Sequence, residues 1–197
     1  MLALLDALQV QRASLVGHSM GGRFAWRFAA AHPERVDKLV LVSPDGFSSP
    51  GFEYGKTPQL PAVAGIMPYV LPRAMVRMNL VAGYTDPAVV TDALLARYYD
   101  LLRAPGVRAA LLERTRQTVL EEPMAILRQV RAPTLLLWGE QDGMIPFANS
   151  TQYLQSLPDV RLVALPGVGH LPQEEAPQRS IGAVRQFLLS PPVAGIL

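Results

Sequence analysis

The chain has 197 residues, of which half are apolar and 17% are charged, a composition that excludes an intrinsically disordered protein. Its net charge is +2 and its basic residues are scattered singly, without interleaved aromatic residues, which argues against nucleic-acid binding. The absence of cysteine excludes disulfide bonds and thiolate metal sites.

The first residues, MLALLDALQVQR, predict an amphipathic helix, because leucines recur at helical spacing between positions 2 and 8. The early Asp6 and the lack of basic residues before it argue against a signal peptide. No apolar run in the sequence reaches the length of a membrane span. We therefore expect a cytoplasmic protein without a membrane span.

Strand-like and helix-like segments alternate towards both ends of the chain. The strand-like segments are short, nearly continuous apolar runs, as in buried parallel sheets. The predicted strands cover 13–17, 36–43, 133–139 and 160–167, and the predicted helices cover 21–31, 145–158 and 174–189. This alternation predicts right-handed βαβ units and an α/β fold, a partial doubly wound parallel sheet of about four strands.

The middle of the chain interrupts this alternation from about Phe47 to Pro123, where no strand is predicted. A loop is expected over SSPGFEYGKTPQLP (48–61), followed by helices over 72–83, 86–106 and 107–117. The chain is therefore expected to divide into a first α/β half (1–47), a helical cap (48–123) and a second α/β half (124–197).

The stretch GHSMGG fits the pattern G-x-S-x-G, between a predicted strand and a predicted helix. Such a sharp turn strains the backbone of the serine and presents its Oγ at the carboxyl end of the sheet, where the helix N-terminus favours negative charge. We infer that Ser19 is a nucleophile and that the N–H of Met20 is an oxyanion donor. The alternative is a glycine-rich turn with an incidental serine.

A serine nucleophile needs a base, and the chain has three histidines. His18 adjoins Ser19 and is expected to pack or to form a hydrogen bond, since neighbouring side chains at such a turn point apart. His32 precedes Pro33 at a helix end and is expected at the surface. His170 follows the last predicted strand within PGVGHLPQEEAP, so it is predicted to be the general base.

Two aspartates follow predicted strand ends and compete for the role of the acid that orients the base. Asp142 lies in WGEQDGMIP, directly after its strand, and Asp45 lies in SPDG. We favour Asp142, because a polar turn punctuated by glycine follows its strand and leads directly into the next predicted helix. Glu174 and Glu175 are expected to interact with the positive end of the last helix.

The segments GHSMGG, HPERVDKLVLVSP, PTLLLWGEQDGMIP and PGVGHLPQEEAP occur in the order serine, acid, histidine. In this order the chain resembles the α/β-hydrolase family. The resemblance implies Ser19 as nucleophile, His170 as general base and Asp142 as orienting acid. It also implies that the cap covers an apolar substrate pocket.

The chain departs from the family in having few residues before the serine. Family members usually carry earlier strands there, together with a loop that donates a second oxyanion N–H. The segment ASLVG (13–17) is then expected at an exposed sheet edge, which is a template for pairing. A fragment, a minimal form with a donor from elsewhere and a homodimer joined at this edge are the alternatives; we expect a truncated or minimal hydrolase that self-associates.

We expect a carboxylesterase that cleaves short to medium acyl or aryl esters through an acyl-enzyme, with no metal and no cofactor. The residues expected to line its apolar substrate pocket are Met67, Tyr69, Met75 and Met78, because methionine adapts to varied apolar shapes. The alternatives are a C–C bond hydrolase of the same fold, which acts on ring-cleavage dienones, and a non-catalytic remnant or binding module.

Overall fold

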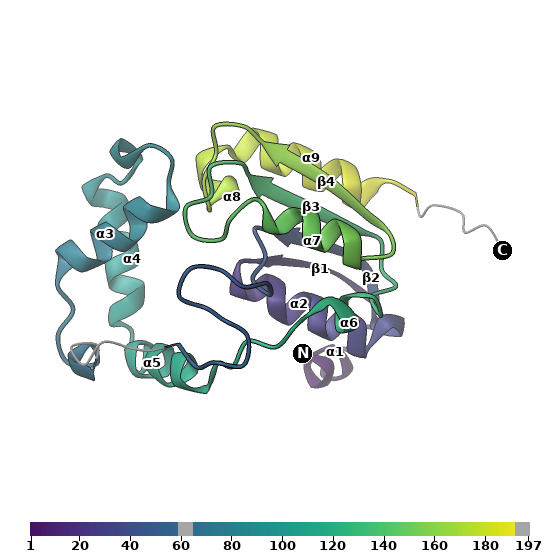
Figure 1. Ribbon diagram of the computed structural model, residues 1–197, viewed down its shortest axis with the longest axis horizontal. Helices are drawn as coiled ribbons and strands as arrows, with labels where there is room; N and C mark the ends of the chain where they lie inside the picture. Colours follow the sequence, from purple (N-terminus) through teal and green to yellow (C-terminus); the bar gives the residue numbers. More distant parts are fainter. Residues whose placement is uncertain (59–64, 192–197) are drawn as a thin grey trace.

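Four parallel strands form the centre of the fold in the computed structural model, which describes residues 1–58 and 65–191 (Figure 1). The strands lie side by side in chain order, and every neighbouring pair is parallel. They are β1 (Ala13–His18), β2 (Val36–Val42), β3 (Thr134–Gly139) and β4 (Val160–Leu165). The predicted α/β class with a four-stranded parallel sheet is confirmed.

Both faces of β2 and β3 are buried, which explains why these strands are nearly continuous apolar runs. Leu39 and Leu41 of β2 pack towards one core and Val40 and Val42 towards the other, because successive side chains of a strand point to opposite faces. The first core lies under α2 (Met20–Ala31), α6 (Met124–Leu127) and α7 (Asn149–Ser156). The second core lies under α9 (Pro177–Leu189), which follows the short helix α8 (Pro172–Glu175).

A buried lysine fastens the C-terminal end of α9 to the sheet. Lys38 of β2 points its Nζ at the end of this helix and donates to the carbonyl oxygens of Phe187 and Leu188, each at 2.9 Å. It also donates to the carbonyl oxygen of Ser190. Because the last carbonyls of a helix have no partner within the helix and carry partial negative charge, the ammonium group is well placed there.

The segment between β2 and β3 carries helices that lie beside the sheet and have their own apolar core (Figure 1). They are α3 (Arg73–Gly83), a 3₁₀ turn (Pro87–Val89), α4 (Asp92–Arg103) and α5 (Val107–Gln117). Within the described part of this segment only isolated bridges occur, Ser49 with Phe52 and Tyr54 with Leu120. The predicted loop over 48–61 lies partly outside the described residues.

The helix predicted over 86–106 is divided in the structure, because two capping side chains follow closely on each other. Asp86 accepts a hydrogen bond from the Ala88 N–H at 2.8 Å and thereby caps the 3₁₀ turn. Thr91 accepts from the Leu94 N–H at 3.2 Å and begins α4. A cap side chain satisfies an N–H that the helix leaves free, so each one fixes a separate start.

Strand β1 lies at one edge of the described sheet, and Val16 in its middle is 57% exposed. The first predicted helix is α1 (Leu2–Ala7), which precedes this strand. Pairing of β1 with a second copy stays a prediction, which sedimentation velocity of the purified chain measures. Among residues 1–58 and 65–191, no helix has the length and hydropathy needed to cross a bilayer.

Candidate active site

Ser19 occupies a strained turn between β1 and α2. Its backbone angles are φ 53° and ψ −122°, in a region that residues with a side chain seldom adopt. Such a conformation costs on the order of 1–3 kcal/mol and persists only where the surroundings impose it. Here the Ser19 N–H donates to the Val42 carbonyl and the Asp45 N–H donates to the Ser19 carbonyl, each at 2.9 Å.

The glycines around Ser19 leave room for this turn. A Cβ on Gly17 would lie 2.5 Å from the carbonyl oxygen of Gly21, which no side chain tolerates. A Cβ on Gly22 would lie 2.8 Å from the Pro44 side chain, whereas one on Gly21 would meet nothing within 4 Å. The close approach of β1 and α2 therefore requires glycine at 17, with Gly21 contributing its backbone to that contact, and the approach of α2 to Pro44 requires glycine at 22.

His170 and Asp142 form a buried pair. Nδ1 of His170 donates to Oδ2 of Asp142 at 2.8 Å, and the two side chains are 5% and 0% exposed. The other carboxylate oxygen of Asp142 accepts from the N–H groups of Met144 and Ile145, each at 2.9 Å. This arrangement places the proton of the imidazole on Nδ1 and leaves Nε2 free to accept another.

The environment of Asp142 keeps this carboxyl group ionised. Burial by itself would raise its pKa, but the hydrogen bond to His170, the charge of His170 and the two backbone N–H donors outweigh burial and lower the pKa below its ordinary value. An ionised carboxylate beside Nδ1 stabilises the imidazolium that forms when Nε2 takes a proton.

The structure places Asp142, not Asp45, against the histidine. The Asp45 carboxylate pairs with the guanidinium of Arg23 at 2.5 Å, and both side chains are largely buried. The main-chain carbonyl of Asp45 accepts from Trp26 and Tyr153, so this residue belongs to the framework behind the serine turn.

His18 connects the serine turn to the loop that carries His170. Its Nε2–H donates to the His170 carbonyl at 2.7 Å, and the two rings lie 4.7 Å apart. The imidazole of His170 is thus brought beside the residue that precedes Ser19. Within the described residues no hydrogen bond joins the Ser19 hydroxyl to His170, so the complete triad stays a prediction; catalytic hydrogen bonds often tighten only when substrate is bound.

The stability of the fold is expected to depend on pH through His18. Burial lowers its pKa below the ordinary value of 6.5, although the hydrogen bond to the His170 carbonyl opposes this shift. As pH falls below 6.5, His18 binds a proton in the unfolded chain but not yet in the folded chain. The free energy of unfolding therefore falls. Urea unfolding at about pH 7.5 and about pH 5.5 measures this loss.

His18→Gln keeps an N–H donor for the His170 carbonyl but cannot titrate. Its free energy of unfolding is expected to fall less between the two pH values than that of the wild-type chain. Equal losses in both chains would contradict the role of His18.

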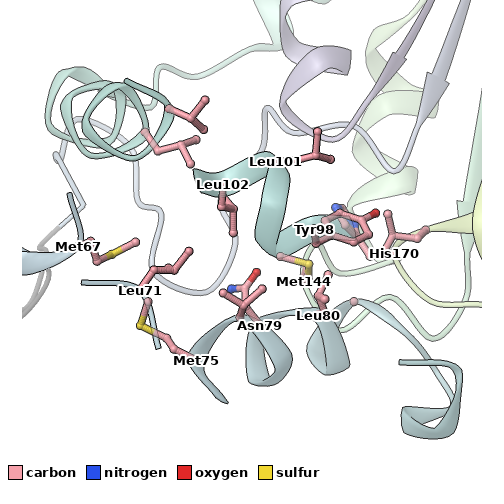
Figure 2. Close-up of a pocket in the computed structure, with 15 residues that line it drawn as sticks. Met67, Leu71, Met75, Asn79, Leu80, Tyr98, Leu101, Leu102, Met144 and His170 are labelled. Atoms are coloured by element: carbon pink, nitrogen blue, oxygen red, sulfur yellow. The ribbon is translucent and has the colours of Figure 1, made fainter. Parts of the chain in front are cut away.

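A cavity of about 640 Å³ opens beside His170, between the helical segment and the sheet (Figure 2). Its lining is almost entirely apolar, with Asn79, Tyr98 and His170 as the polar side chains among the lining residues. Figure 2 shows His170 and Tyr98 at one end and Met67, Leu71 and Met75 at the other. An elongated apolar molecule with a reactive group near one end fits this shape.

Two of the four side chains expected in the cavity lie in it and two do not. Met67 and Met75 line the cavity, whereas Met78 and Tyr69 point into solvent and are 71% and 84% exposed. The reason for Met78 is helix phase: α3 turns Met75, Val76, Asn79 and Leu80 towards the cavity, and Met78 lies on the opposite face.

The cavity residues of α4 and of the loop after β3 were not predicted from the sequence. Tyr98, Leu101 and Leu102 come from α4, and their helical spacing was the available signal. Met144 follows Asp142, and its N–H donates to that carboxylate, which carries the side chain to the cavity.

Met20 is the first residue of α2, so its N–H has no acceptor within the helix. Its role as an oxyanion donor stays a prediction. Residues 1–58 and 65–191 hold no cluster of three or more acidic and histidine side chains that could bind a metal ion.

The sequence pattern of the alpha/beta hydrolase family matches residues 1–183. A 2-hydroxymuconate semialdehyde hydrolase of Pseudomonas putida is 32% identical over 95% of this chain, which spans 66% of that relative. A meta-cleavage product hydrolase from Pseudomonas fluorescens (CumD) has a similar structure, with a TM-score of 0.78 and 26% identity over 95% of this chain and 68% of that one. A bacterial membrane phospholipase A is also similar, with a TM-score of 0.73 and 27% identity over 94% of this chain and 59% of that one.

Proposed function

Because the chain belongs to the alpha/beta hydrolase family, we propose that it is a serine hydrolase that cleaves the C–C bond beside a carbonyl group in a ring-cleavage product. Ser19 is the nucleophile, His170 the general base and Asp142 the acid that orients it. The buried pair of His170 and Asp142 at one end of an apolar cavity carries this proposal. The 32% identity to a 2-hydroxymuconate semialdehyde hydrolase favours C–C cleavage over the ester hydrolysis that the sequence analysis placed first.

The reaction begins when the Ser19 oxygen bonds to the substrate carbonyl carbon and its proton passes to Nε2 of His170. The carbonyl oxygen becomes an oxyanion, and the N–H of Met20 donates to it. The negative carboxylate of Asp142 stabilises the imidazolium during this step.

The C–C bond then breaks, and its electron pair remains on the departing carbon fragment. The dienol must first move its hydroxyl proton to the carbon of the scissile bond. The conjugated ketone formed in this way then delocalises the charge of the departing fragment, and His170 returns the serine proton to that fragment. Water next attacks the acyl group on Ser19 with His170 as base, which releases a carboxylic acid and restores the serine. An ester follows the same steps with an alkoxide as the leaving group.

Ester hydrolysis remains the second candidate because the described residues that line the cavity offer no positive charge to a negatively charged substrate. No lysine or arginine lines the cavity among the described residues. Arg97 lies 5.8 Å from the ring centroid of Tyr98, and Arg108 donates to the Met67 carbonyl, but neither side chain is in the lining. A substrate carboxylate therefore finds no counter-ion there, whereas an uncharged ester needs none.

Turnover of two substrates by the purified chain decides between these functions. The assay compares kcat/KM for 2-hydroxymuconate semialdehyde, followed by loss of its dienol absorbance, with kcat/KM for p-nitrophenyl butyrate. We expect the higher value for the first, and a higher value for the ester reverses the order of the two candidates. A folded chain that turns over neither substrate contradicts the proposal that it is a hydrolase.

The far end of the cavity is expected to select the length of the substrate. Met67→Trp fills that end, so kcat/KM for p-nitrophenyl octanoate is expected to fall about tenfold or more relative to p-nitrophenyl acetate. Met78→Trp is the matched control, because Met78 lies outside the cavity. Equal losses for both esters in Met67→Trp, or the same selective loss in Met78→Trp, contradict this assignment.

A further inference from the structure

The loop that carries His170 is fastened to the helical segment by a carboxylate that the reaction itself does not use. We propose that Glu174 is a positioning residue for His170, which it holds in place by joining α8 to two tyrosines of the helical segment. This inference rests on the proposed function, since it assigns the residue that keeps the general base of that reaction in position. It also predicts a structural effect that can be measured without turnover.

Both oxygens of the Glu174 carboxylate accept a hydrogen bond from a phenol. Oε2 accepts from Tyr84 and Oε1 from Tyr98, each at 2.7 Å. The two tyrosines come from different elements, because Tyr84 follows α3 and Tyr98 lies in α4. Glu174 was expected at the positive end of the last predicted helix; it lies in the first turn of α8, where its carboxylate is bonded to both phenols.

Both phenols are favoured in their neutral, hydrogen-bond-donating form. Burial raises the pKa of Tyr84, and its hydrogen bond to Glu174 raises this pKa further. The same two causes, in the same order, raise the pKa of Tyr98. Hydrogen bonds to a charged acceptor are stronger than neutral ones, so one carboxylate with two such donors makes a firm junction.

The backbone around His170 is held by the same junction. The His170 N–H donates to the Gly83 carbonyl at 2.9 Å, so a residue at the end of α3 bonds the base directly. Glu175 accepts from the Thr85 N–H at 3.1 Å and from the Gly169 N–H at 2.9 Å.

The contact between residues 83–85 and residues 169–175 is tightly packed at Gly169. A Cβ on Gly169 would lie 2.7 Å from the Glu175 carboxylate and 2.8 Å from the Gly83 carbonyl. Residues 83–85 and 169–175 are therefore packed as one unit, and a shift of the helical segment moves the His170 loop with it.

The junction connects the cavity wall to the base. Tyr98 lines the cavity next to His170 (Figure 2). Its hydroxyl donates to the Glu174 carboxylate. Leu80 and Gly83, which also line the cavity, precede Tyr84 on α3. A substrate that contacts these lining residues thus contacts elements that are bonded to the His170 loop. Loss of the junction is expected to lower the reactivity of the site more than the stability of the fold.

The test uses Glu174→Gln and the double variant Tyr84→Phe/Tyr98→Phe in the full chain. Tyr99→Phe is the matched control, because the Tyr99 hydroxyl donates to the Leu71 carbonyl within the helical segment and does not reach the His170 loop. The first readout is the rate at which a small fluorophosphonate labels Ser19. In that reaction the Ser19 oxygen bonds to phosphorus, fluoride leaves, and His170 accepts the serine proton.

We expect labelling to slow by about tenfold to a hundredfold in both test variants, in line with the cost of a misplaced catalytic group. The unfolding midpoints of both test variants should remain close to that of the wild-type chain. The labelling rate of the control Tyr99→Phe should also remain close to wild type. The second readout is hydrogen exchange of the His170 amide, which should speed up in the test variants because its bond to Gly83 is loosened.

Labelling and His170 exchange that remain at wild-type values in both test variants overturn the inference. A fall in labelling that is matched by a loss of global stability also overturns it, because Glu174 is then only a structural contact. If wild-type Ser19 is not labelled at all, the proposed function fails, and the exchange measurement still decides whether Glu174 positions the loop.

Discussion

Replacing Ser19 with alanine is expected to lower kcat for the preferred substrate by roughly a millionfold, the scale seen when a serine protease loses its nucleophile. The reason is that no covalent acyl intermediate can form, while the cavity and the pair of His170 and Asp142 remain. KM is expected to change little, since the apolar lining supplies most of the binding. Steady-state kinetics with a folded variant, verified by circular dichroism, measures the effect.

Ser14→Ala is the matched control for this experiment, because Ser14 lies on the same strand β1 and its side chain is exposed. Its kcat is expected to equal that of the wild-type chain. Retention of activity in Ser19→Ala would remove Ser19 from the mechanism.

Replacing Asp142 with asparagine is expected to lower kcat by about 10⁴-fold, as the equivalent change does in a Ser-His-Asp protease. An amide at this position removes the negative charge beside Nδ1 and permits the wrong tautomer of His170. The loss should appear in kcat for every substrate, because the substitution affects His170 and not the cavity.

Asp142→Asn should also change how the free energy of unfolding depends on pH in acid. Because the folded pKa of Asp142 lies below its ordinary value of 3.8, its charge stabilises the fold above that value, and this contribution is lost as pH falls through the lowered pKa. The asparagine variant lacks this contribution, so its free energy of unfolding should differ most from wild type near neutral pH. Urea unfolding over a pH series measures the difference.

Asp45→Asn distinguishes the two aspartates that the sequence placed after strand ends. It breaks the pair with Arg23 but leaves His170 and its partner intact, so kcat should stay within about tenfold of wild type while stability falls. If Asp45→Asn damages kcat as much as Asp142→Asn does, the assignment of the acid is wrong.

Much of the fold could be predicted from the chain, because the strands carry their own signal. A segment such as VDKLVLVS is apolar on both of its faces, and only a strand covered on both sides buries such a run. The division of the helix predicted over 86–106 was missed, since periodicity does not reveal that Asp86 and Thr91 each cap a separate start. The last predicted helix is likewise divided, into α8 and α9, with Pro177 at the start of the second.

The sequence best predicted which side chains lie close together where position along a strand fixes position in space. Asp142 and His170 follow adjacent parallel strands, β3 and β4, so their side chains meet at one rim of the sheet. The cavity could be predicted only in part, because the face of α3 that turns inward depends on how the helical segment docks. That docking turns Met75 inward and Met78 outward, although both are methionines of the same helix.

The amino-acid sequence by itself determined the parallel sheet, the glycine-rich turn at Ser19 and the positions of Asp142 and His170 after strand ends, since each rests on local pattern or on strand ends. Only the tertiary structure decided that Asp45 pairs with Arg23, and that Glu174 reaches two tyrosines some 76 and 90 positions earlier in the chain. The physical reason is that a hydrogen-bond partner is chosen by proximity in space, and no local periodicity records which distant side chains packing brings within reach.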